Sequence, residues 1–225
     1  MCVKKKCWLC CMVVILAIFP LCAQTALEQR LEEEGLVDVH RMDSTIQVRL
    51  MYARADNFVG KVLYKELTRA YLLPETARAL VKAQQILKRS HPDYSLCIYD
   101  AARPMSVQQQ MWNAVAGTSK YLYVSNPAHG GGLHNYGLAV DVSIVDGRGD
   151  SIPMGTRVDH LGKEAHIDTE VQRVNSGKLS RQAYQNRLLL RRVMREAGFK
   201  TLRSEWWHFN FKSRAEAKAS YRPVL

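Results

Sequence analysis

The chain has 225 residues, and 32 lysines and arginines against 21 aspartates and glutamates give it a formal net charge of +11. This length is enough for one well-buried domain and too short for two ordinary ones. The basic balance comes without a nucleic-acid-binding motif, so we expect no nucleic-acid partner.

The first 23 residues have the pattern of a secretory signal peptide. Lys4–Lys6 form a basic n-region, Trp8–Leu21 form an apolar run, and Ala23 offers a small residue for cleavage. The run is too short for a comfortable transmembrane helix. We therefore expect residues 1–23 to be removed and residues 24–225 to form one exported, periplasmic domain without stable membrane insertion. The alternative is a membrane anchor made by an uncleaved or lipidated N-terminus.

The cysteines and basic residues are unevenly distributed. Five of the six cysteines lie in the leader, so the mature domain has no internal disulfide, and Cys97 is expected to be a small buried hydrophobe. Loss of the three leader lysines lowers the net charge to about +8. The densest remaining basic cluster is expected to be a solvated helix face; it comprises Arg187, Arg191, Arg192 and Arg195.

Hydrophobic periodicity predicts short strands mixed with amphipathic helices. The expected strands cover residues 37–40, 46–52, 95–99, 138–144 and 205–211, and the expected helices cover residues 75–89, 106–116 and 181–197. Because regular βαβ alternation is missing, the order predicts a single α+β domain with a central antiparallel sheet flanked by helices.

The strand at residues 138–144 has the clearest alternation. Its core-facing set is expected to be Leu138, Val140, Val142 and Ile144, and its other face Ala139, Asp141 and Ser143. The second set is small and polar, which suits the wall of a metal site.

Four side chains carry the strongest chemical signal. His134 and Asp141 are near neighbours in sequence, and His208 follows downstream with Glu205 three residues before it. Two imidazoles and one carboxylate make a three-ligand set for zinc, which keeps a fourth position for water in catalytic sites. Glu205 is placed where a general base is needed, so the pattern predicts metal-assisted hydrolysis.

The spacing of these residues requires two irregularities. Seven residues of straight strand would separate His134 from Asp141 by roughly 23 Å and put them on opposite faces, so the chain must turn between them, near Gly137. Glu205 and His208 are also an odd number of residues apart, so either Glu205 precedes the strand proper or a bulge lies there.

The other five histidines are expected to be structural or exposed. They are His40, His91, His129, His160 and His166. If one of the three chosen ligands is misassigned, His129 and His166 are the best reserves.

Together these motifs resemble the zinc D-Ala-D-Ala metallopeptidases and, within them, the D-alanyl-D-alanine dipeptidases. That family's metal signatures are Ser-x-His-x-x-Gly-x-Ala-x-Asp, matched by Gly132–Asp141, and Glu-x-x-His, matched by Glu205–His208. Tyr99–Pro104 resembles the family's Tyr/Asp-x-x-Arg-Pro segment, and Met154–Asp159 resembles its Met-Gly-Thr-x-x-Asp segment. The likeness extends in order over about residues 36–211.

The resemblance implies roles for individual residues. His134, Asp141 and His208 would hold one zinc ion per chain, Glu205 would be the catalytic base, and Arg103 would stabilise the transition state. The alternative for Arg103 is a surface salt bridge with Asp100. The resemblance also implies a compact α+β fold with a central antiparallel sheet.

Substrate contacts are expected at three further residues. Asp159 is expected to bind the free ammonium group of a short substrate, and its alternative is an ordinary loop cap. Tyr136 and Trp207 are expected to line the pocket, and their alternative is packing. Gly132 departs from the family signature, because a hydroxyl-bearing serine is missing there.

These inferences predict a zinc dipeptidase that cleaves D-Ala-D-Ala or a related cell-wall dipeptide. The segment 146–179 is long enough to close the pocket around a short substrate. One alternative is a D,D-carboxypeptidase or endopeptidase that acts on longer peptidoglycan stems. The second alternative is a non-catalytic wall-binding module.

Overall fold

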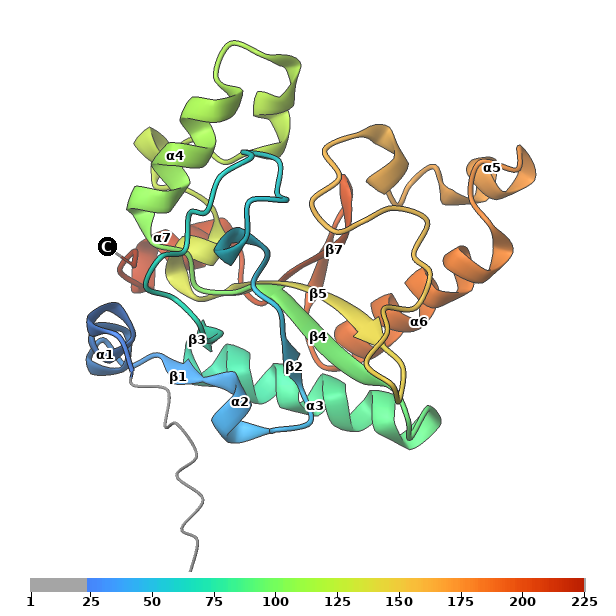
Figure 1. Ribbon diagram of the computed structural model, residues 1–225, viewed down its shortest axis with the longest axis horizontal. Helices are drawn as coiled ribbons and strands as arrows, with labels where there is room; N and C mark the ends of the chain where they lie inside the picture. Colours follow the sequence, from blue (N-terminus) through green and yellow to red (C-terminus); the bar gives the residue numbers. More distant parts are fainter. Residues whose placement is uncertain (1–23, 225) are drawn as a thin grey trace, which may run out of the picture.

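A five-stranded sheet forms the centre of the computed structural model, which describes residues 24–224 (Figure 1). In spatial order its strands are β2 (Gln47–Val48), β4 (Ser95–Asp100), β5 (Ala139–Val145), β7 (Glu205–Asn210) and β6 (Lys200–Leu202). The predicted signal peptide, residues 1–23, lies outside the described residues.

The sheet is antiparallel over four of its five strands. β4 pairs with β5, β5 with β7, and β7 with β6, all antiparallel. At one edge β2 runs parallel to β4, so the sheet is mixed there. The parallel pair arises because a crossover helix lies between the two strands in the chain, and such a connection returns the chain in the same direction.

The two long helices cover one face of the sheet (Figure 1). α3 (Pro74–Ser90) begins with proline at its first turn, where the missing N–H costs nothing. In α6 (Arg181–Glu196) the Ser180 side chain accepts from the backbone N–H of Ala183, which caps the helix start. Both helices, together with α4 (Met105–Val115), confirm the helices predicted from periodicity.

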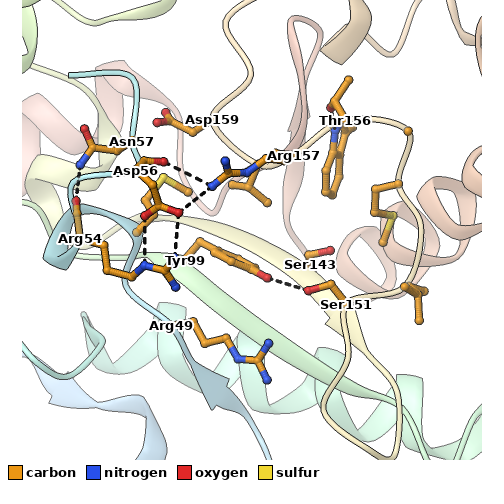
Figure 2. A pocket seen from close by; sticks show the side chains of 16 residues that line it. Arg49, Arg54, Asp56, Asn57, Tyr99, Ser143, Ser151, Thr156, Arg157 and Asp159 are labelled. Carbon is orange, nitrogen blue, oxygen red and sulfur yellow. Dashed lines mark hydrogen bonds and ion pairs between the residues drawn. The ribbon is translucent and has the colours of Figure 1, made fainter. Parts of the chain in front are cut away.

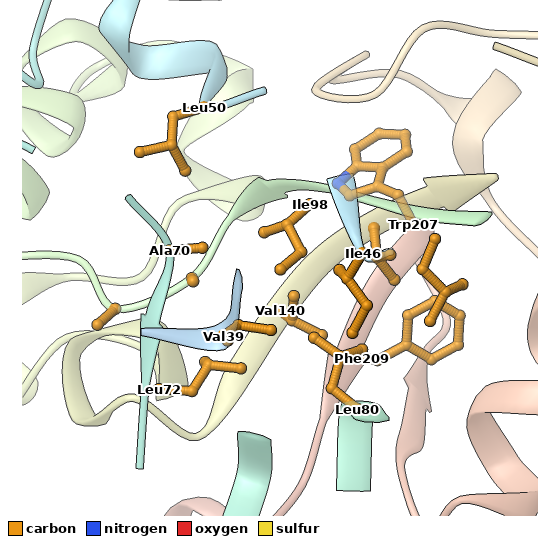
Figure 3. Close-up of a cluster of buried hydrophobic side chains, with 14 of the residues drawn as sticks. Val39, Ile46, Leu50, Ala70, Leu72, Leu80, Ile98, Val140, Trp207 and Phe209 are labelled. Atoms are coloured by element: carbon orange, nitrogen blue, oxygen red, sulfur yellow. The ribbon is translucent and has the colours of Figure 1, made fainter. Parts of the chain in front are cut away.

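The main hydrophobic core lies between these helices and the sheet (Figure 3). Val140 and Val142 of β5 contribute to it, as the alternation predicts, and Leu80 of α3 lies opposite them. Trp207 and Phe209 of β7 are also fully buried in this cluster. Burial of one such side chain contributes about 1.5–3 kcal/mol, so this face anchors the strands that carry the site on their other face.

Two predicted strands are shorter than expected. The strand expected at residues 37–40 stops after β1 (Val37–Asp38), because the Asp38 side chain accepts from the N–H of His40 and starts the short helix α2 (Val39–Met42). The strand expected at residues 46–52 is limited to β2, and a 3₁₀ turn, η1 (Met51–Ala53), follows.

Several short elements have no long-range periodicity and were not expected. The helices among them are α1 (Ala26–Glu33), α5 (Glu170–Asn175) and α7 (Arg214–Ser220), and the strands are β3 (Tyr71–Leu72), which pairs with β1, and β6. α1 and α7 both begin with a capping box, which satisfies N–H groups at the helix start. No helix among the described residues is long and apolar enough to span a membrane.

Candidate metal centre

Two of the predicted ligands face each other across neighbouring strands. Asp141 of β5 is the direct register partner of His208 of β7. Cross-strand partners have Cβ atoms about 4.5–5.5 Å apart, so this pairing brings the two side chains into reach of one ion. The distance between the His208 Nδ1 atom and the Asp141 Oδ1 atom is 3.0 Å.

A tight turn delivers the third ligand. His134 lies in the 3₁₀ turn η4 (Leu133–Tyr136), and Gly137 closes it with a left-handed φ of 64°. A Cβ at Gly137 would lie 3.1 Å from the backbone nitrogen of Leu73, so a larger residue would meet both steric strain and a close neighbour. The predicted turn between His134 and Asp141 is therefore confirmed, with Asp141 on the strand.

The three ligand atoms converge on a single point. The His134 Nε2 atom lies 3.3 Å from Asp141 Oδ1 and 3.2 Å from His208 Nδ1. Four ligand atoms around zinc at about 2.0–2.1 Å would be separated by about 3.3–3.4 Å in a tetrahedron, which agrees with these values. Within residues 24–224, these side chains form the one three-residue group able to hold a metal ion.

Hydrogen bonds on the far side of each imidazole orient the ligands. The His134 Nδ1–H donates to the carbonyl oxygen of Ala101 at 2.8 Å, and the His208 Nε2–H donates to Asn210 Oδ1 at 2.8 Å. In the neutral tautomers these bonds define, both ring nitrogens that face Asp141 carry a lone pair. A buried group of three lone pairs is stabilised by a cation, so the donor set fits a metal ion.

The electrostatic field at the site also favours positive charge. Burial opposes protonation of His134, but the carboxylates of Asp141 and Asp100 raise its pKa. Burial likewise opposes ionisation of Asp141, and the two imidazoles lower its pKa. The same surroundings that favour a proton on His134 favour a metal cation between the ligands.

Glu205 stands beside the ligands without joining them. Its Oε2 atom lies 3.9 Å from His208 Nδ1, and its side chain lines the same cavity. The register of β7 against β6 shifts between Thr201 and Leu202, so Glu205 enters the strand through an irregularity, as the odd spacing predicts. Burial raises the pKa of Glu205 to about 7, and the neighbouring His208 opposes this shift.

Arg103 is fixed by a buried polar network. Its Nε donates to Asp100 Oδ2 at 2.9 Å and its Nη1 donates to Gln108 Oε1 at 2.8 Å, and a short bond joins Nη2 to the same carboxylate oxygen. Asp100 also accepts from the hydroxyl of Tyr64 and is fully buried. A guanidinium has five N–H donors, so these three bonds leave two for another group.

The Arg103 side chain is directed toward the metal centre and not the surface. Its side chain is only 11% exposed, and its backbone N–H donates to the carbonyl oxygen of His134 at 3.0 Å. Its guanidinium lies over the ring of Tyr52, 5.3 Å from the centroid. The pair with Asp100 therefore exists, but it is buried beside the site, unlike the surface salt bridge considered as the alternative.

These groups line a cavity of about 450 Å³, and Asp159 lies in its wall. Asp159 has a left-handed φ of 69°, which is rare for a residue with a side chain. Its carboxylate accepts from the Tyr52 hydroxyl at 2.8 Å and from the Phe58 backbone N–H at 3.1 Å. Burial raises the pKa of Asp159 to about 7, against the effect of these two hydrogen bonds.

A second cavity, of about 570 Å³, shares Asp159 with the first (Figure 2). Two segments meet at its rim. Asp56 pairs with Arg54 of its own segment at 2.8 Å and with Arg157 of the other segment at 3.0 Å. On its floor, the hydroxyls of Tyr99 and Ser151 lie 3.1 Å apart. The three metal-binding side chains line the smaller cavity and not this one.

Comparison with known proteins assigns this architecture. Residues 32–222 match the family described as D-Ala-D-Ala dipeptidase, within the M15 peptidases. The chain belongs to the D-Ala-D-Ala dipeptidase family. This membership confirms the predicted family and the predicted enzyme class, a metallopeptidase, and it argues against a non-catalytic wall-binding module.

Individual members of the dipeptidase family are similar over most of their length. The D-alanyl-D-alanine dipeptidase of Escherichia coli K12 is 32% identical over 180 residues, which cover 80% of this chain and 86% of the relative. The D-alanyl-D-alanine dipeptidase of Enterococcus faecium is 29% identical and covers 70% of this chain and 82% of its own. The D-alanyl-D-alanine dipeptidase of Enterococcus faecalis is 26% identical, and the match covers 79% of this chain and 91% of the relative.

Not every predicted site residue of this family member faces the cavity. Tyr136 is buried in a second hydrophobic cluster, and its hydroxyl donates to the carbonyl oxygen of Gly130, so it packs and does not line the metal cavity. Trp207 borders the cavity, but it is 2% exposed and packs within the main core (Figure 3). The reserve ligands lie apart from the three: His129 is exposed, and His166 pairs with Tyr123.

Sequence reasoning missed the residues that hold the site in place. Tyr52, Tyr64 and Gln108 fix Asp159, Asp100 and Arg103, respectively. Tyr52 and Tyr64 lie on different segments from the carboxylates that they hold, and Gln108 points inward from α4. The sequence offered one signal for them, which is the position of Gln108 on the otherwise apolar face of its helix. An amide buried on such a face needs hydrogen-bond partners.

The predicted solvated arginine cluster is corrected in part: Arg192 and Arg195 are exposed as predicted, but Arg187 and Arg191 are not. Arg187 is 1% exposed, and its Nε donates to the carbonyl oxygen of Met154 at 2.6 Å. Its Nη1 pairs with Glu170 at 3.3 Å, and Arg191 pairs with the same carboxylate at 2.6 Å. Because an unpaired buried charge is costly, this network ties the segment that leads to Asp159 onto α6.

Proposed function

We propose that this member of the family is a zinc-dependent dipeptidase that hydrolyses D-Ala-D-Ala or a closely related cell-wall dipeptide. One observation carries the proposal: His134, Asp141 and His208 present three convergent donor atoms, with the carboxyl of Glu205 beside them. The names of the similar proteins support the choice of substrate.

The three residues would hold one zinc ion per chain. Two imidazole nitrogens and one carboxylate oxygen are a common ligand set for catalytic zinc. When bound, zinc supplies positive charge that acidifies water and polarises a carbonyl group.

Glu205 and Arg103 then have complementary roles. Glu205 accepts a proton from the attacking water and passes it to the leaving amine, and a pKa near 7 suits both transfers at neutral pH. Arg103 directs its two remaining N–H donors at the negative charge that develops on the scissile carbonyl oxygen. Because Asp100 and Gln108 already hold the guanidinium, little reorganisation is needed.

Asp159 binds the ammonium group at the N-terminus of the dipeptide. Its carboxylate lies in the cavity wall, and the bonds from Tyr52 and Phe58 hold it in a strained backbone conformation. Such strain is retained where a site requires it. An ammonium group bound there limits the length of the substrate.

The second cavity favours one competing function. It adjoins the metal cavity at Asp159, and a volume of about 570 Å³ would accommodate further residues of a peptidoglycan stem. A D,D-carboxypeptidase or endopeptidase would use that space, whereas a dipeptidase would not.

We also propose that the mature chain acts outside the cytoplasm, in the periplasm. The support is the basic and apolar pattern of residues 1–23, and the substrate is a fragment of the cell wall. The mass of the protein recovered from a periplasmic extract tests this. A mass that includes residues 1–23 would show an uncleaved anchor instead.

The decisive experiment compares two substrates. The purified, zinc-loaded protein is incubated with D-Ala-D-Ala and with a stem pentapeptide that ends in D-Ala-D-Ala, and free D-Ala is measured. We expect release from the dipeptide alone. Release from the pentapeptide alone would establish the carboxypeptidase, and release from neither would refute the proposed function.

A further inference from the structure

Ser125 fills the space that a side chain at position 132 would need. Gly132 has φ −106° and ψ −177°, an extended conformation that any residue adopts. A Cβ placed on Gly132 would lie 3.0 Å from the Ser125 Oγ atom and 3.4 Å from its Cβ atom. A side chain at position 132 would therefore crowd the neighbouring serine, although the backbone conformation would accept one.

The hydroxyl of Ser125 is available to a ligand. Ser125 and Gly132 both line the metal cavity. Within the described part of the chain, the Ser125 hydroxyl forms no hydrogen bond with another residue, although its carbonyl oxygen is bonded. A hydroxyl in a polar cavity is both donor and acceptor, so it can bind the polar group of a substrate.

The backbone at Ser125 is held by the same residue that holds Arg103. The Gln108 Nε2 atom donates to the Ser125 carbonyl oxygen at 2.7 Å, and the Gln108 Oε1 atom accepts from Arg103 at 2.8 Å. Gln108 is fully buried. This shared anchor gives the hydroxyl a fixed position relative to the guanidinium, as a binding group requires.

The charge of the surrounding wall indicates which substrate group the hydroxyl would meet. Lys212 and Arg214 line the same cavity, and Arg214 donates to the carbonyl oxygen of His129 in the loop between Ser125 and Gly132. The carboxylate of Asp159 also lines the cavity, but it belongs to a different segment. One basic and one acidic segment match the carboxylate and the ammonium of a dipeptide zwitterion.

We infer that Ser125 is a substrate-binding residue whose hydroxyl donates a hydrogen bond to the carboxylate of the bound dipeptide, in space left free by Gly132. The inference rests on the proposed dipeptidase function. It assigns the binding hydroxyl to a different segment from the one that carries His134.

The first test removes the hydroxyl. Because a hydrogen bond to a charged group is stronger than one between neutral groups, Ser125→Ala should lower kcat/KM for D-Ala-D-Ala about tenfold or more, mainly through KM. Zinc content and the unfolding midpoint should stay unchanged. Ser119→Ala is the matched control, because Ser119 is exposed at the start of the preceding 3₁₀ turn, η2 (Ser119–Tyr123). Activity of Ser125→Ala within twofold of the control would overturn the inference.

The second test moves the hydroxyl to position 132. In the Ser125→Ala background, the Cβ of a residue at 132 meets only a methyl group at 3.4 Å, an ordinary contact. We expect Ser125→Ala combined with Gly132→Ser to recover most of the lost kcat/KM. Ser125→Ala combined with Gly132→Ala adds the same carbon without the oxygen and should not recover it. Equal activity of the two double variants would reject the inference.

Failure of the inference and failure of the proposed function are distinguishable. A wild-type protein that cleaves neither dipeptide nor pentapeptide refutes the proposed function. A wild-type protein that cleaves the dipeptide, with no effect of Ser125→Ala, refutes only the role of Ser125.

Discussion

At the scale of single residues, Glu205 combines burial with access to the metal cavity. Burial raises the pKa of its carboxyl to about 7, while its Oε2 atom stays 3.9 Å from the nearest ligand nitrogen, that of His208. A carboxyl at this distance is near enough to take a proton from water at the centre, while the group of side chains able to hold the ion consists of His134, Asp141 and His208 without Glu205.

Glu205→Gln should therefore abolish turnover and leave metal binding intact. General base catalysis contributes about 10²–10⁴-fold, so we expect kcat to fall by at least that range. The zinc content of the variant, measured by atomic absorption, should equal that of the wild type. Loss of zinc together with activity would mean that Glu205 is a ligand.

Asp159 should make substrate affinity dependent on pH. Burial raises the pKa of this carboxyl to about 7, so the fraction that is ionised falls as the pH drops through 7. Because only the carboxylate attracts an ammonium group, KM for the dipeptide should rise below pH 7. Asp159→Asn should have a high KM without this dependence, when KM is measured from pH 6 to 9. A parallel pH profile in the variant would assign the titration to another group.

At the scale of elements, α6 acts as an anchor for the segment that carries Asp159. Arg187 projects from α6 into a fully buried position and binds the carbonyl oxygens of Met154 and Glu164 in addition to Glu170. A Cβ at Gly155 would lie 2.3 Å from Leu179 and 3.4 Å from the Arg187 guanidinium, so the chain packs tightly there. Arg187 thus bonds backbone carbonyl groups in a segment that has little secondary structure to satisfy them.

Arg187→Met should destabilise the fold far more than the same change at an exposed arginine of α6. The substitution leaves Glu170 with one of its two arginine partners and leaves buried carbonyl groups without a donor. Breaking a buried ion pair costs about 3–5 kcal/mol, whereas a surface change costs within about 0.5 kcal/mol. Urea unfolding of this variant and of Arg192→Met, an exposed neighbour, measures the difference. Equal midpoints would show that the buried network contributes nothing to stability.

At the scale of the whole molecule, the metal centre joins distant parts of the chain. His134 follows the loop after α4, Asp141 lies in the middle of the sheet, and His208 belongs to a strand near the C-terminus. A cation that binds all three exists only in the folded state, so its binding free energy adds to folding.

Removal of metal should therefore lower the melting temperature of the protein. A ligand present at 100 times its Kd raises the free energy of unfolding by about 2.7 kcal/mol. For a domain of this size, each kcal/mol shifts the melting temperature by about 2–4 °C. We expect EDTA to lower the midpoint by about 5–10 °C and added zinc to restore it, as followed by calorimetry. His134→Ala should show no response to either treatment. If EDTA left the melting temperature of the wild type unchanged, metal binding would not contribute to the stability of the fold.

The long helices and central strands were predictable because their patterns are local. α3, α6 and β5 are amphipathic over many residues, and packing rewards that periodicity wherever the element lies. The short elements were not predictable, since β3 and β6 have only two and three residues and depend on partners elsewhere in the chain. The predicted antiparallel sheet is mixed at its edge for the same reason.

The candidate site divides in a similar way. The amino-acid sequence by itself determined which side chains offer metal ligands and a base, because residue type and spacing carry that chemistry. Only the tertiary structure decided that Asp141 pairs with His208, that Arg187 is buried, and that Ser125 fills the space beside Gly132. The physical reason is that register, burial and steric exclusion are contacts between segments far apart in the chain, and no local pattern encodes them.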